Sequence, residues 1–379
     1  MMQKIGILGG GQLGKMLCLA AAPLDIQVYV MDSDPEMPAA KLCNTFVKGN
    51  FDNYDDVYRF GQLADVITIE IEHVNTEALL KLETEGKVVH PAPAKLAIIQ
   101  DKGLQKKYFV QHEIPTSDFK LFESAEQIRM ALKEQSIHYP FVQKLRRGGY
   151  DGKGVELIRS AADLHKLMAG QSVVEELVDI AMEIAVIACR NEKGEIACFP
   201  AVEMEFHPTA NLVEYLACPA RISGYVAAEA EALATKVIES FDICGLLAVE
   251  MFLTTKNELI VNEVAPRPHN SGHHTIDSCY TSQFQQHLRG ILNLPLGSTK
   301  MKTPSIMVNL LGEEGYAGEV HYDGIADALS MEGVNIHLYG KKTTKPYRKM
   351  GHLTVVADTI NEAKETAEEA KKVLKVICR

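Results

Sequence analysis

Short apolar runs alternate with amphipathic stretches over the first hundred residues of the chain. The runs predict buried strands and the stretches between them predict helices, a pattern typical of βαβ units and a parallel sheet. The predicted strands are Lys4–Leu8, Gln27–Met31, Val66–Ile71 and Val88–His90, and the predicted helices are Gly14–Ala22, Tyr54–Leu63 and Thr76–Glu85.

The middle and the end of the chain mix helices with longer strands. A hairpin is predicted from Met182 to Ala201, with its turn at 191–194. Further strands are predicted at 245–253 and 258–264, and helices near 101–112, 124–135, 160–169, 226–241 and from Asn361 to Ile377. The composition changes near residues 100 and 296, so we expect domain boundaries there, and 379 residues suffice for two or three domains.

Charge and cysteine usage narrow the class of protein. Lys plus Arg number 39 and Asp plus Glu number 50, a formal charge of 39 − 50 = −11, which argues against a general nucleic-acid binder. No apolar run reaches the length of about 18 residues that a membrane span needs, and the N-terminal apolar run leads straight into glycines. We therefore expect a cytoplasmic protein. Its eight scattered cysteines, without a CxxC pair, favour reduced thiols over a disulfide framework or a zinc site.

A glycine-rich turn, Gly9–Gly14, lies between a predicted strand and a predicted helix. It matches G-x-G-x-x-G, and Asp32 follows at the end of the second predicted strand. Glycines at this spacing let a phosphate approach the backbone, and a helix N-terminus favours its charge. The turn therefore indicates a dinucleotide such as NAD or FAD, another anion, or only a tight strand-to-helix connection.

A second glycine-rich segment, Arg146–Gly154, combines four glycines with three cations. Successive backbone N–H groups in such a loop can hold a phosphate, and Lys144 lies close enough in sequence to reach the same anion. The alternative is a surface hairpin turn through Asp151 and Gly152. The spacing does not match the P-loop pattern.

Two acidic residues, Glu250 and Glu263, stand on consecutive predicted strands. A two-residue turn at Lys256–Asn257 places them directly opposite on one sheet face and pairs Phe252 with Val261. Like charges in that position repel. A Mg²⁺ ion between the carboxylates removes the repulsion, since it prefers oxygen ligands together with substrate phosphates. The alternatives are an exposed pair, or a turn of another length that separates the two residues.

Three further segments are candidates for binding. Glu175–Val178, with Glu183 after it, can meet an adenine edge and ribose hydroxyls, although acidic surface residues are the plainer interpretation. The loop Pro266–His274 is rich in polar residues and in prolines that restrict the backbone, which predicts a binding loop. Its three histidines lack the Cys or Asp partners of a familiar zinc site. A basic cluster in this acidic protein is either a solvated face or a receptor for a substrate phosphate, and it comprises Lys341, Lys342, Lys345, Arg348 and Lys349.

Together these segments resemble the ATP-grasp superfamily and, within it, the N5-carboxyaminoimidazole ribonucleotide synthetase family. The segments that carry the resemblance are GILGGGQLGKM, IEIEHV, RRGGYDGKG, EELV, PAVEMEFH, VNEVAPRPHNSGHHT and RKMGH, from residue 5 to residue 352. The resemblance implies an α/β ATP-grasp fold. Its parts would be a Rossmann-like, doubly wound domain at 1–100, a central ATP-grasp domain at 101–295 with a lid at about 113–180, and a small α+β domain at 296–379.

The resemblance also implies an activity, namely carboxylation of 5-aminoimidazole ribonucleotide in purine biosynthesis. The reaction would use ATP and bicarbonate, pass through carboxyphosphate and need Mg²⁺, and the enzyme would be a homodimer. The catalytic residues would be Asp151, Arg267 and Lys349, and Glu250 and Glu263 would hold the metal. The ATP-binding residues would be Lys102, Lys144, Gly149, Tyr150, Asp151, Gly152, Lys153, Gly154, Val155, Glu175, Glu176, Leu177, Val178, Glu183, His207, Asn262 and Glu263. The substrate-binding residues would be Gln12, Leu13, Glu72, His73, Tyr150, Arg267, Asn270, Ser271, Gly272, His273, Lys341, Arg348 and Lys349.

Three residues depart from the family pattern: Gln143 before the phosphate lysine, His274 in place of an aromatic residue, and Tyr347 in place of a glycine. The rival functions are a nucleotide-dependent oxidoreductase, another ATP-grasp ligase such as a formate-dependent glycinamide ribonucleotide transformylase or a D-alanine–D-alanine ligase, and a nucleotide sensor without turnover. The oxidoreductase explains the first glycine turn but gives no role to Glu250, Glu263 or the second glycine loop.

Overall fold

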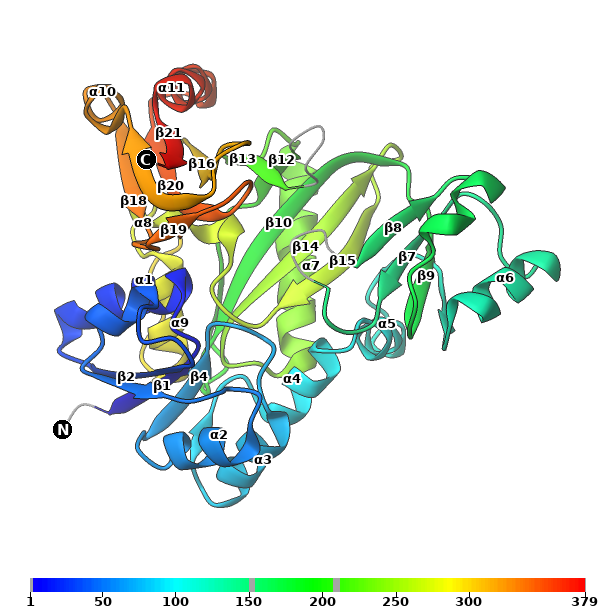
Figure 1. Cartoon of the computed structure of the whole chain (residues 1–379), viewed down its shortest axis with the longest axis horizontal. Coiled ribbons are helices and arrows are strands. Elements are labelled where there is room, and N and C mark those ends of the chain that lie inside the picture. The colour runs from blue at the N-terminus through cyan, green and yellow to red at the C-terminus, as the bar shows by residue number, and fades with distance from the viewer. Residues whose placement is uncertain (1–2, 150–153, 207–211, 379) are drawn as a thin grey trace.

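The computed structural model describes residues 3–149, 154–206 and 212–378, and in this part of the chain the strands form four sheets (Figure 1). The N-terminal sheet is parallel in the order β3-β2-β1-β4-β5, so the predicted doubly wound arrangement is confirmed. Its strands are β1 (Lys4–Leu8), β2 (Gln27–Asp32), β3 (Thr45–Lys48), β4 (Val66–Ile69) and β5 (Val88–Val89). The helices around it are α1 (Gln12–Ala21), α2 (Tyr54–Gly61), α3 (Thr76–Thr84) and α4 (Pro93–Ile99); β3 and α4 were not predicted.

A small antiparallel sheet, in the order β6-β9-β7-β8, lies with α6 at the far right of Figure 1. The elements here are α5 (Lys102–Gln111), β6 (Phe119–Phe122), α6 (Ala125–Lys133), β7 (Phe141–Leu145), β8 (Val155–Ile158) and β9 (Ser172–Glu176). The helix predicted at 160–169 is wrong in type, because Ala161–Lys166 forms a 3₁₀ helix. None of its residues is buried, so no packed apolar face stabilises a longer α-helix.

The largest sheet joins the centre of the chain to its C-terminal part. Its strands follow the order β15-β14-β10-β12-β13-β16-β20-β18, with β11 on β10. They are β10 (Ile180–Arg190), β11 (Ile196–Cys198), β12 (Val202–Phe206), β13 (Val213–Cys218), β14 (Gly245–Thr254), β15 (Leu259–Ala265), β16 (Ser305–Leu311), β18 (Val334–Leu338) and β20 (Lys349–Val356). Because β13 pairs with β16, the sheet contains strands from both sides of the boundary predicted near residue 296. The division into domains at 100 and 296 stays a prediction.

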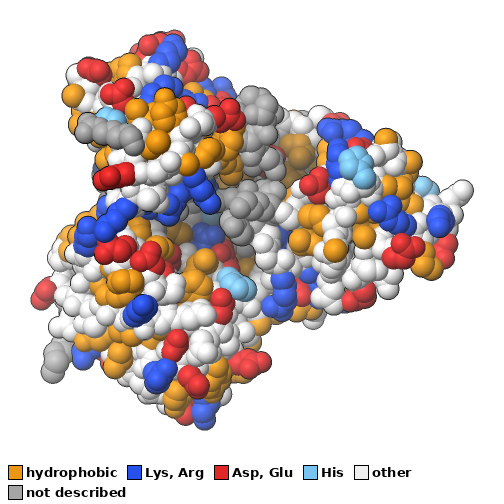
Figure 2. All heavy atoms as spheres, viewed as in Figure 1, with side chains coloured by type: hydrophobic (Ala, Val, Ile, Leu, Met, Phe, Trp, Pro, Cys, Tyr) orange, Lys and Arg blue, Asp and Glu red, His pale blue; other side chains and the backbone are white. Residues whose placement is uncertain are grey.

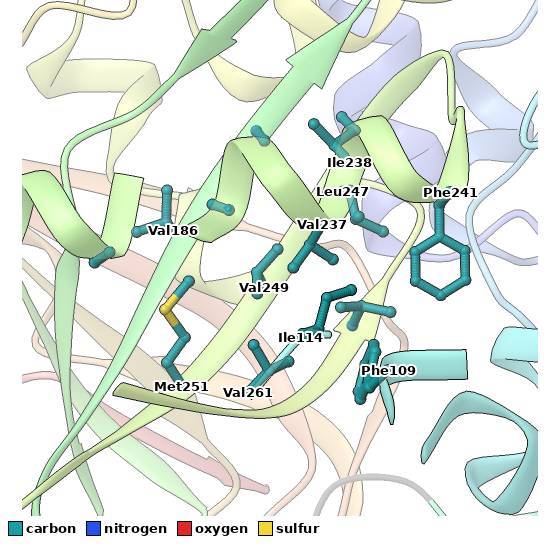
Figure 3. Close-up of a cluster of buried hydrophobic side chains, with 14 of the residues drawn as sticks. Phe109, Ile114, Val186, Val237, Ile238, Phe241, Leu247, Val249, Met251 and Val261 are labelled. Carbon is teal, nitrogen blue, oxygen red and sulfur yellow. The ribbon is translucent and has the colours of Figure 1, made fainter. Parts of the chain in front are cut away.

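The main hydrophobic core lies between this sheet and the long helix α7 (Gly224–Phe241) (Figure 3). Figure 3 shows Val237 of α7 beside Val249 of β14, with Phe241 at the end of the helix. Odd-numbered residues of β14, such as Leu247, Val249 and Met251, face this core. Because strand side chains alternate between faces, the even-numbered Glu250 must point to the opposite face.

The hairpin of β14 and β15 brings Glu250 and Glu263 together, but not by the predicted turn. Phe252 pairs with Ile260 rather than Val261, since the turn is one residue longer than expected. A β-bulge between these pairs and the Glu250–Glu263 pair then shifts the register back by one residue. The opposition of the two carboxylates is confirmed, whereas the predicted partners nearer the turn are wrong.

Helix α9 (Gln283–Ile291) joins the N-terminal sheet to the large sheet. Its Phe284, Leu288 and Ile291 pack in one cluster with residues of α1 and β1. Its buried His287 shares a hydrogen bond of 2.9 Å between Nε2 and Thr68 Oγ1 and accepts one of 3.2 Å at Nδ1 from the Leu246 N–H. The N-terminal sheet is thereby tied to β14.

The C-terminal end differs from the prediction. Helix α11 covers Ile360–Val373, and the next residues form β21 (Lys375–Cys378) instead of continuing the helix to Ile377. Strand β21 pairs with β17 (Gly318–Asp323), which also pairs with β19 (Thr343–Thr344). A distant partner strand therefore overrides the helical pattern at the end of the chain. The remaining short helices are α8 (Thr275–Ser278) and α10 (Ile325–Leu329).

Candidate active site

Three carboxylates lie on the face of the large sheet opposite α7. Glu250 stands across from Glu263, and Glu183 lies on the neighbouring strand two residues from Ala185, the partner of Glu250. Burial, with Glu263 and Glu183 nearby, raises the pKa of Glu250 to about 8. Lys102 instead holds the pKa of Glu263 at about 2, and burial raises the pKa of Glu183 to about 7. The protonated form of Glu250 is therefore favoured beside Glu263, whose ionised form Lys102 favours.

Two lysines face these carboxylates. Lys102, the first residue of α5, forms an ion pair with Glu263. Lys144 of β7 donates a 2.7 Å hydrogen bond to Oδ1 of Asn262, the residue before Glu263. The cations come from α5 and the small sheet, and the acids come from the large sheet. The site is therefore assembled across the two central parts of the molecule.

A third lysine, Lys106, belongs to the same charged group and was not predicted. It is 2% exposed, and its Nζ lies 3.2 Å from Oε2 of Glu175. Burial lowers the pKa of Lys106 to about 8. Because Lys102 and Lys106 are four residues apart on α5, they share one helix face, and this spacing is the signal that could have revealed it.

The side chain of Glu175 is engaged by the lysines, and the predicted contact of residues 175–178 with adenine stays a prediction. The Glu175 side chain is 3% exposed, accepts a 2.7 Å hydrogen bond from Ser117 Oγ and lies 3.1 Å from the Lys144 ammonium. Its carboxylate thus holds the lysines in place. Any contact of this segment with an adenine ring falls to the next residues, Glu176 to Val178.

A cavity of about 290 Å³ opens beside those residues. One wall is the connector from β9 to β10, and the other is the β14–β15 turn with the segment just before β6. The lining residues are Thr116, Ser117, Asp118, Glu176, Leu177, Val178, Asp179, Thr254, Thr255, Lys256, Glu258 and Ile260. Backbone groups and apolar side chains on opposite walls suit a flat heteroaromatic ring.

The residues around Glu250 and Glu263 fit a divalent cation. Their donor atoms are carboxylate and amide oxygens, and the raised pKa of Glu250 shows that a second negative charge at this position is unfavourable without a cation. Among the described residues, no group of three or more His, Cys, Asp or Glu side chains is arranged to hold a metal ion. Two carboxylates completed by substrate phosphates is the arrangement that Mg²⁺ commonly uses.

The second glycine-rich loop leaves the small sheet between β7 and β8. Arg146 is not available to an anion in this loop, since it donates two hydrogen bonds of 2.8 Å to Asp101. Gly148 and Gly154 have positive φ angles of 77° and 74°, a conformation that side chains disfavour. Gly149 and Val155 flank the tip of the loop. Tyr150, Asp151, Gly152, Lys153 and, elsewhere, His207 lie outside the described residues.

The loop after β15 begins next to the metal-binding candidates. Arg267 forms an ion pair of 2.7 Å with Glu72, at the edge of the N-terminal sheet. His269 Nε2 lies 3.2 Å from Glu250 Oε1, and Ser271 Oγ shares a 2.9 Å hydrogen bond with His269 Nδ1. Asn270 and Gly272 follow in the same short 3₁₀ turn. The loop therefore connects the carboxylate pair to the N-terminal part of the molecule.

His273 is held in one orientation by Gln283, which was not predicted. The Gln283 amide oxygen accepts from the His269 N–H, so its Nε2 group faces the Nδ1 atom of His273 at 3.0 Å. The His273 Nδ1 atom is therefore an acceptor and its proton resides on Nε2. Burial, with the charges of His269 and Lys349 nearby, keeps the pKa of His273 well below its usual value. A neutral imidazole thus faces the basic cluster.

The basic cluster lies where the C-terminal part meets α1. Lys341 Nζ donates a 2.8 Å hydrogen bond to the Lys349 carbonyl, and Arg348 donates to Thr343. Lys15 of α1 donates 2.7 Å and 3.3 Å hydrogen bonds to the carbonyls of Leu338 and Tyr339, just before Lys341. Figure 2 shows Lys and Arg side chains bordering the hollow between these two parts.

Two predicted substrate residues are placed differently from the others. Leu13 is 8% exposed and packs in the core between α1 and α9, so only its backbone can face a ligand. His73 is largely exposed and pairs with Asp52 at 3.2 Å. Gln12 begins α1, and Glu72 follows β4 and pairs with Arg267.

Comparison with protein families divides the chain among three family descriptions. Residues 2–100 match the ribonucleotide synthetase preATP-grasp domain, residues 107–284 match the ATP-grasp domain, and residues 305–366 match the phosphoribosylaminoimidazole carboxylase C-terminal domain. The N5-carboxyaminoimidazole ribonucleotide synthetase from Thermotoga maritima is 44% identical, with a TM-score of 0.91 over 100% of both chains. The chain belongs to the N5-carboxyaminoimidazole ribonucleotide synthase family.

Other relatives give the same family. The synthase of Bacillus subtilis is 35% identical over 94% of this chain and 92% of its own length. The Aspergillus clavatus synthase, solved with ADP and 5-aminoimidazole ribonucleotide, is 34% identical with a TM-score of 0.89 over 98% of both chains. The chloroplastic phosphoribosylaminoimidazole carboxylase of Vigna aconitifolia is 37% identical over 94% of this chain. This chain spans only 64% of that longer relative. No helix among the described residues is long and apolar enough to cross a membrane.

The three departures from the family pattern have different surroundings. Gln143 of β7 is fully buried. Its amide group hydrogen-bonds to the Met168 backbone and to Ser172, and so ties β7 to the segment that leads into β9. Burial lowers the pKa of His274 to about 4, and its ring is held by Ser278. Tyr347 has a φ of 62°, a backbone conformation that glycine adopts without the steric cost of a side chain.

Proposed function

We propose that this protein carboxylates the exocyclic amine of 5-aminoimidazole ribonucleotide, using ATP and bicarbonate and forming ADP and phosphate. The observation that carries the proposal is the course of β15 and the loop after it. From the opposed Glu263 this segment reaches Arg267 and His269 within six residues, and His269 Nε2 lies 3.2 Å from Glu250 Oε1. Groups suited to phosphoryl transfer and groups suited to a ribonucleotide therefore share one wall. The family membership and the ligands of the Aspergillus clavatus relative support the same reaction.

The first step transfers the γ-phosphoryl group of ATP. A bicarbonate oxygen attacks the γ-phosphorus, the bond to the ADP oxygen breaks, and carboxyphosphate forms. Lys102 and Lys144 would stabilise the charge on the phosphoryl oxygens, with Gly149, Gly152, Lys153, Gly154 and Val155 closing over them. Glu250 and Glu263, with Asn262 beside them, would hold Mg²⁺, which supplies neutralisation of phosphate charge when bound.

The second step transfers the carboxyl group. Carboxyphosphate breaks down to CO₂ and phosphate, and the amine nitrogen attacks the CO₂ carbon and loses a proton. We assign acceptance of that proton to Asp151 and orientation of the bicarbonate-derived group to Arg267 and Lys349. Exclusion of water during this step protects carboxyphosphate from hydrolysis. Tyr150, beside Asp151, would belong to the same closing loop.

The remaining assignments follow the family resemblance, and the cavity beside Glu176 supports the place given to adenine. Adenine would occupy the cavity beside Glu176, Leu177 and Val178, with Glu183 at the ribose and His207 near the nucleotide. The ribonucleotide would lie between the N-terminal and C-terminal parts. It would meet Gln12, the Leu13 backbone, Glu72, His73, Asn270, Ser271, Gly272, His273, Lys341 and Arg348. A homodimer is proposed from the family, and sedimentation equilibrium of the purified chain tests it.

The decisive assay measures ADP release from Mg-ATP with the ribonucleotide and bicarbonate added separately and together. We expect full release only when both are present, with the unstable N5-carboxy product trapped. Release that needs formate or an amino acid instead would retain the ATP site and overturn the acceptor. Reduction of added NAD would favour the oxidoreductase.

A further inference from the structure

The turn Gly9–Gly14 has the sequence of a phosphate-binding turn, yet the protein itself provides the anion. In dinucleotide-binding domains, the backbone N–H groups of such a turn and the N-terminus of the following helix receive a phosphate. Here the Gly11 N–H donates a 2.8 Å hydrogen bond to Glu70 Oε1, and the Gly14 N–H donates a 2.8 Å hydrogen bond to Glu70 Oε2. Glu70 follows directly after β4, the strand beside β1.

The glycines of the turn make room for this carboxylate. A Cβ atom on Gly9 would lie 2.5 Å from Glu70 Cγ, and one on Gly11 would lie 2.6 Å from Glu70 Oε1. Such distances are far below van der Waals contact. Glu70 therefore excludes side chains at these two positions without a bound nucleotide, and the φ of 101° at Gly9 favours glycine there independently.

The second part of the fingerprint is also satisfied internally. In a dinucleotide site, an acidic residue at the end of the second strand accepts hydrogen bonds from ribose hydroxyls. The corresponding Asp32 is 5% exposed, and its Oδ2 accepts a 2.8 Å hydrogen bond from the Gly10 N–H. Both acidic residues thus bind the turn itself.

Glu70 also connects the turn to the substrate side of the molecule. Burial raises the pKa of Glu70, and the N–H groups of Gly14 and Gly11 and the charge of Arg267 oppose that rise. Arg267 in turn pairs with Glu72, two residues after Glu70. A change at Glu70 therefore acts on the start of α1 and on Arg267 together.

We propose that Glu70 is a positioning residue that occupies the phosphate place of the turn. It excludes nucleotide phosphates from the N-terminal domain and holds the turn and Arg267 in the arrangement that receives the ribonucleotide. The effect on the ribonucleotide rests on the proposed function. The exclusion of anions does not, because it concerns only the turn.

The test replaces the resident carboxylate with one added in solution. Glu70→Ala frees the N–H groups of Gly11 and Gly14, and acetate supplies a carboxylate of similar shape that can bind to them. We expect acetate, compared with chloride at equal ionic strength, to raise the melting temperature of Glu70→Ala in a saturable way. It should not do so for the wild type or for Glu83→Ala, a control at an exposed acid of the same domain. Equal acetate effects in all three proteins would overturn the exclusion of anions.

Kinetics test the positioning role separately. Loss of two charge-assisted hydrogen bonds should raise the KM for the ribonucleotide about tenfold or more in Glu70→Ala. The value of kcat should change less than about threefold, and acetate should restore KM. A KM within twofold of the wild type, or one that acetate leaves unchanged, would overturn the role.

A second variant keeps the proposal testable if Glu70→Ala does not fold. Glu70→Gln preserves size, and its amide oxygen can accept only one of the two N–H groups. We expect a raised KM for the ribonucleotide and no acetate effect, because the glutamine side chain still fills the space beside Gly11 and Gly14. Kinetics identical to the wild type would contradict the proposal. A wild type without carboxylation would refute the proposed function and leave the melting experiment valid.

Discussion

Two groups of buried acidic side chains near the proposed active site are held in opposite ways. Glu70 and Asp32 accept hydrogen bonds from backbone N–H groups of the Gly9–Gly14 turn, and for Glu70 these bonds oppose the rise in pKa that burial causes. Glu250 faces another carboxylate across two strands, and its pKa is raised to about 8. The comparison teaches that a satisfied carboxylate positions its neighbours, whereas an opposed pair is prepared for a cation.

Removing the charge of Glu263 should have the largest effect. We expect Glu263→Gln to abolish turnover, because a metal ligand and the partner of Lys102 are both lost. Stability of the metal-free protein should fall by about 1–2 kcal/mol, less than for a fully buried ion pair because 39% of the Glu263 side chain is exposed. ADP release and urea unfolding measure the two effects. The control is Glu239→Gln, at an exposed acid on α7. Activity at ordinary Mg²⁺ concentrations would show that the metal assignment is wrong.

The same substitution at Glu250 should stabilise the metal-free protein. The pKa of Glu250 is raised from 4.5 to about 8. Between these values the folded protein binds more protons than the unfolded chain, so stability falls as pH rises. Glu250→Gln removes this loss, and we expect a gain of about 1–3 kcal/mol at pH 8 and little gain at pH 4.

Unfolding of both proteins across this pH range, with EDTA present, measures the difference. A gain that is independent of pH would mean that Glu250 is not the titrating group. If Glu250→Gln and Glu263→Gln shift stability in the same direction, the contrast between the two members of the pair fails.

A smaller effect is expected from the lysine after the glycine turn. Lys15 donates to two backbone carbonyls directly before Gly340 and Lys341. Lys15→Met keeps the apolar part of the side chain and loses these bonds, so KM for the ribonucleotide should rise about fivefold. The value of kcat should change little. Steady-state kinetics measure both, with Lys41→Met as the exposed control. A fall in kcat at unchanged KM would argue against a positioning role of α1.

The smallest effect concerns a strained backbone in the basic cluster. Tyr347 has a φ of 62°, and its hydroxyl group bonds to Glu314. Tyr347→Ala removes the ring and keeps the strain, whereas Tyr347→Gly removes both. We expect the glycine variant to be more stable than the alanine variant by about 1 kcal/mol. Thermal unfolding compares them, and equal stabilities would show that the positive φ carries no cost here.

Several parts of the fold followed from local patterns. The parallel N-terminal sheet was predictable, since its strands are short apolar runs separated by helices. The hairpin at 182–201 was predictable from its glycine-containing turn, and β10 and β11 confirm it. The predicted end of the last helix, at Ile377, was wrong, because Lys375–Cys378 pairs with β17 and no local pattern reveals that partner.

The carboxylate pair was predicted for a partly wrong reason. The turn between β14 and β15 is longer than assumed, and a β-bulge near Asn262 restores the pairing of Glu250 with Glu263. A bulge depends on how both strands pack against α7, with Val261 and Val264 both in the core. Spacing alone cannot show it.

The sequence by itself determined which residues carry charge, where glycines leave the backbone open, and four of the five strands of the N-terminal sheet, with β3 missed. These properties depend on side-chain chemistry and on neighbours close in the chain. Only the tertiary structure decided that Glu70 fills the Gly9–Gly14 turn, that Lys106 joins Glu175, and that Gln283 orients His273. The first two contacts join segments that are distant in sequence, and the third joins two turns of chain ten residues apart, so all three depend on how sheets and helices pack around the core.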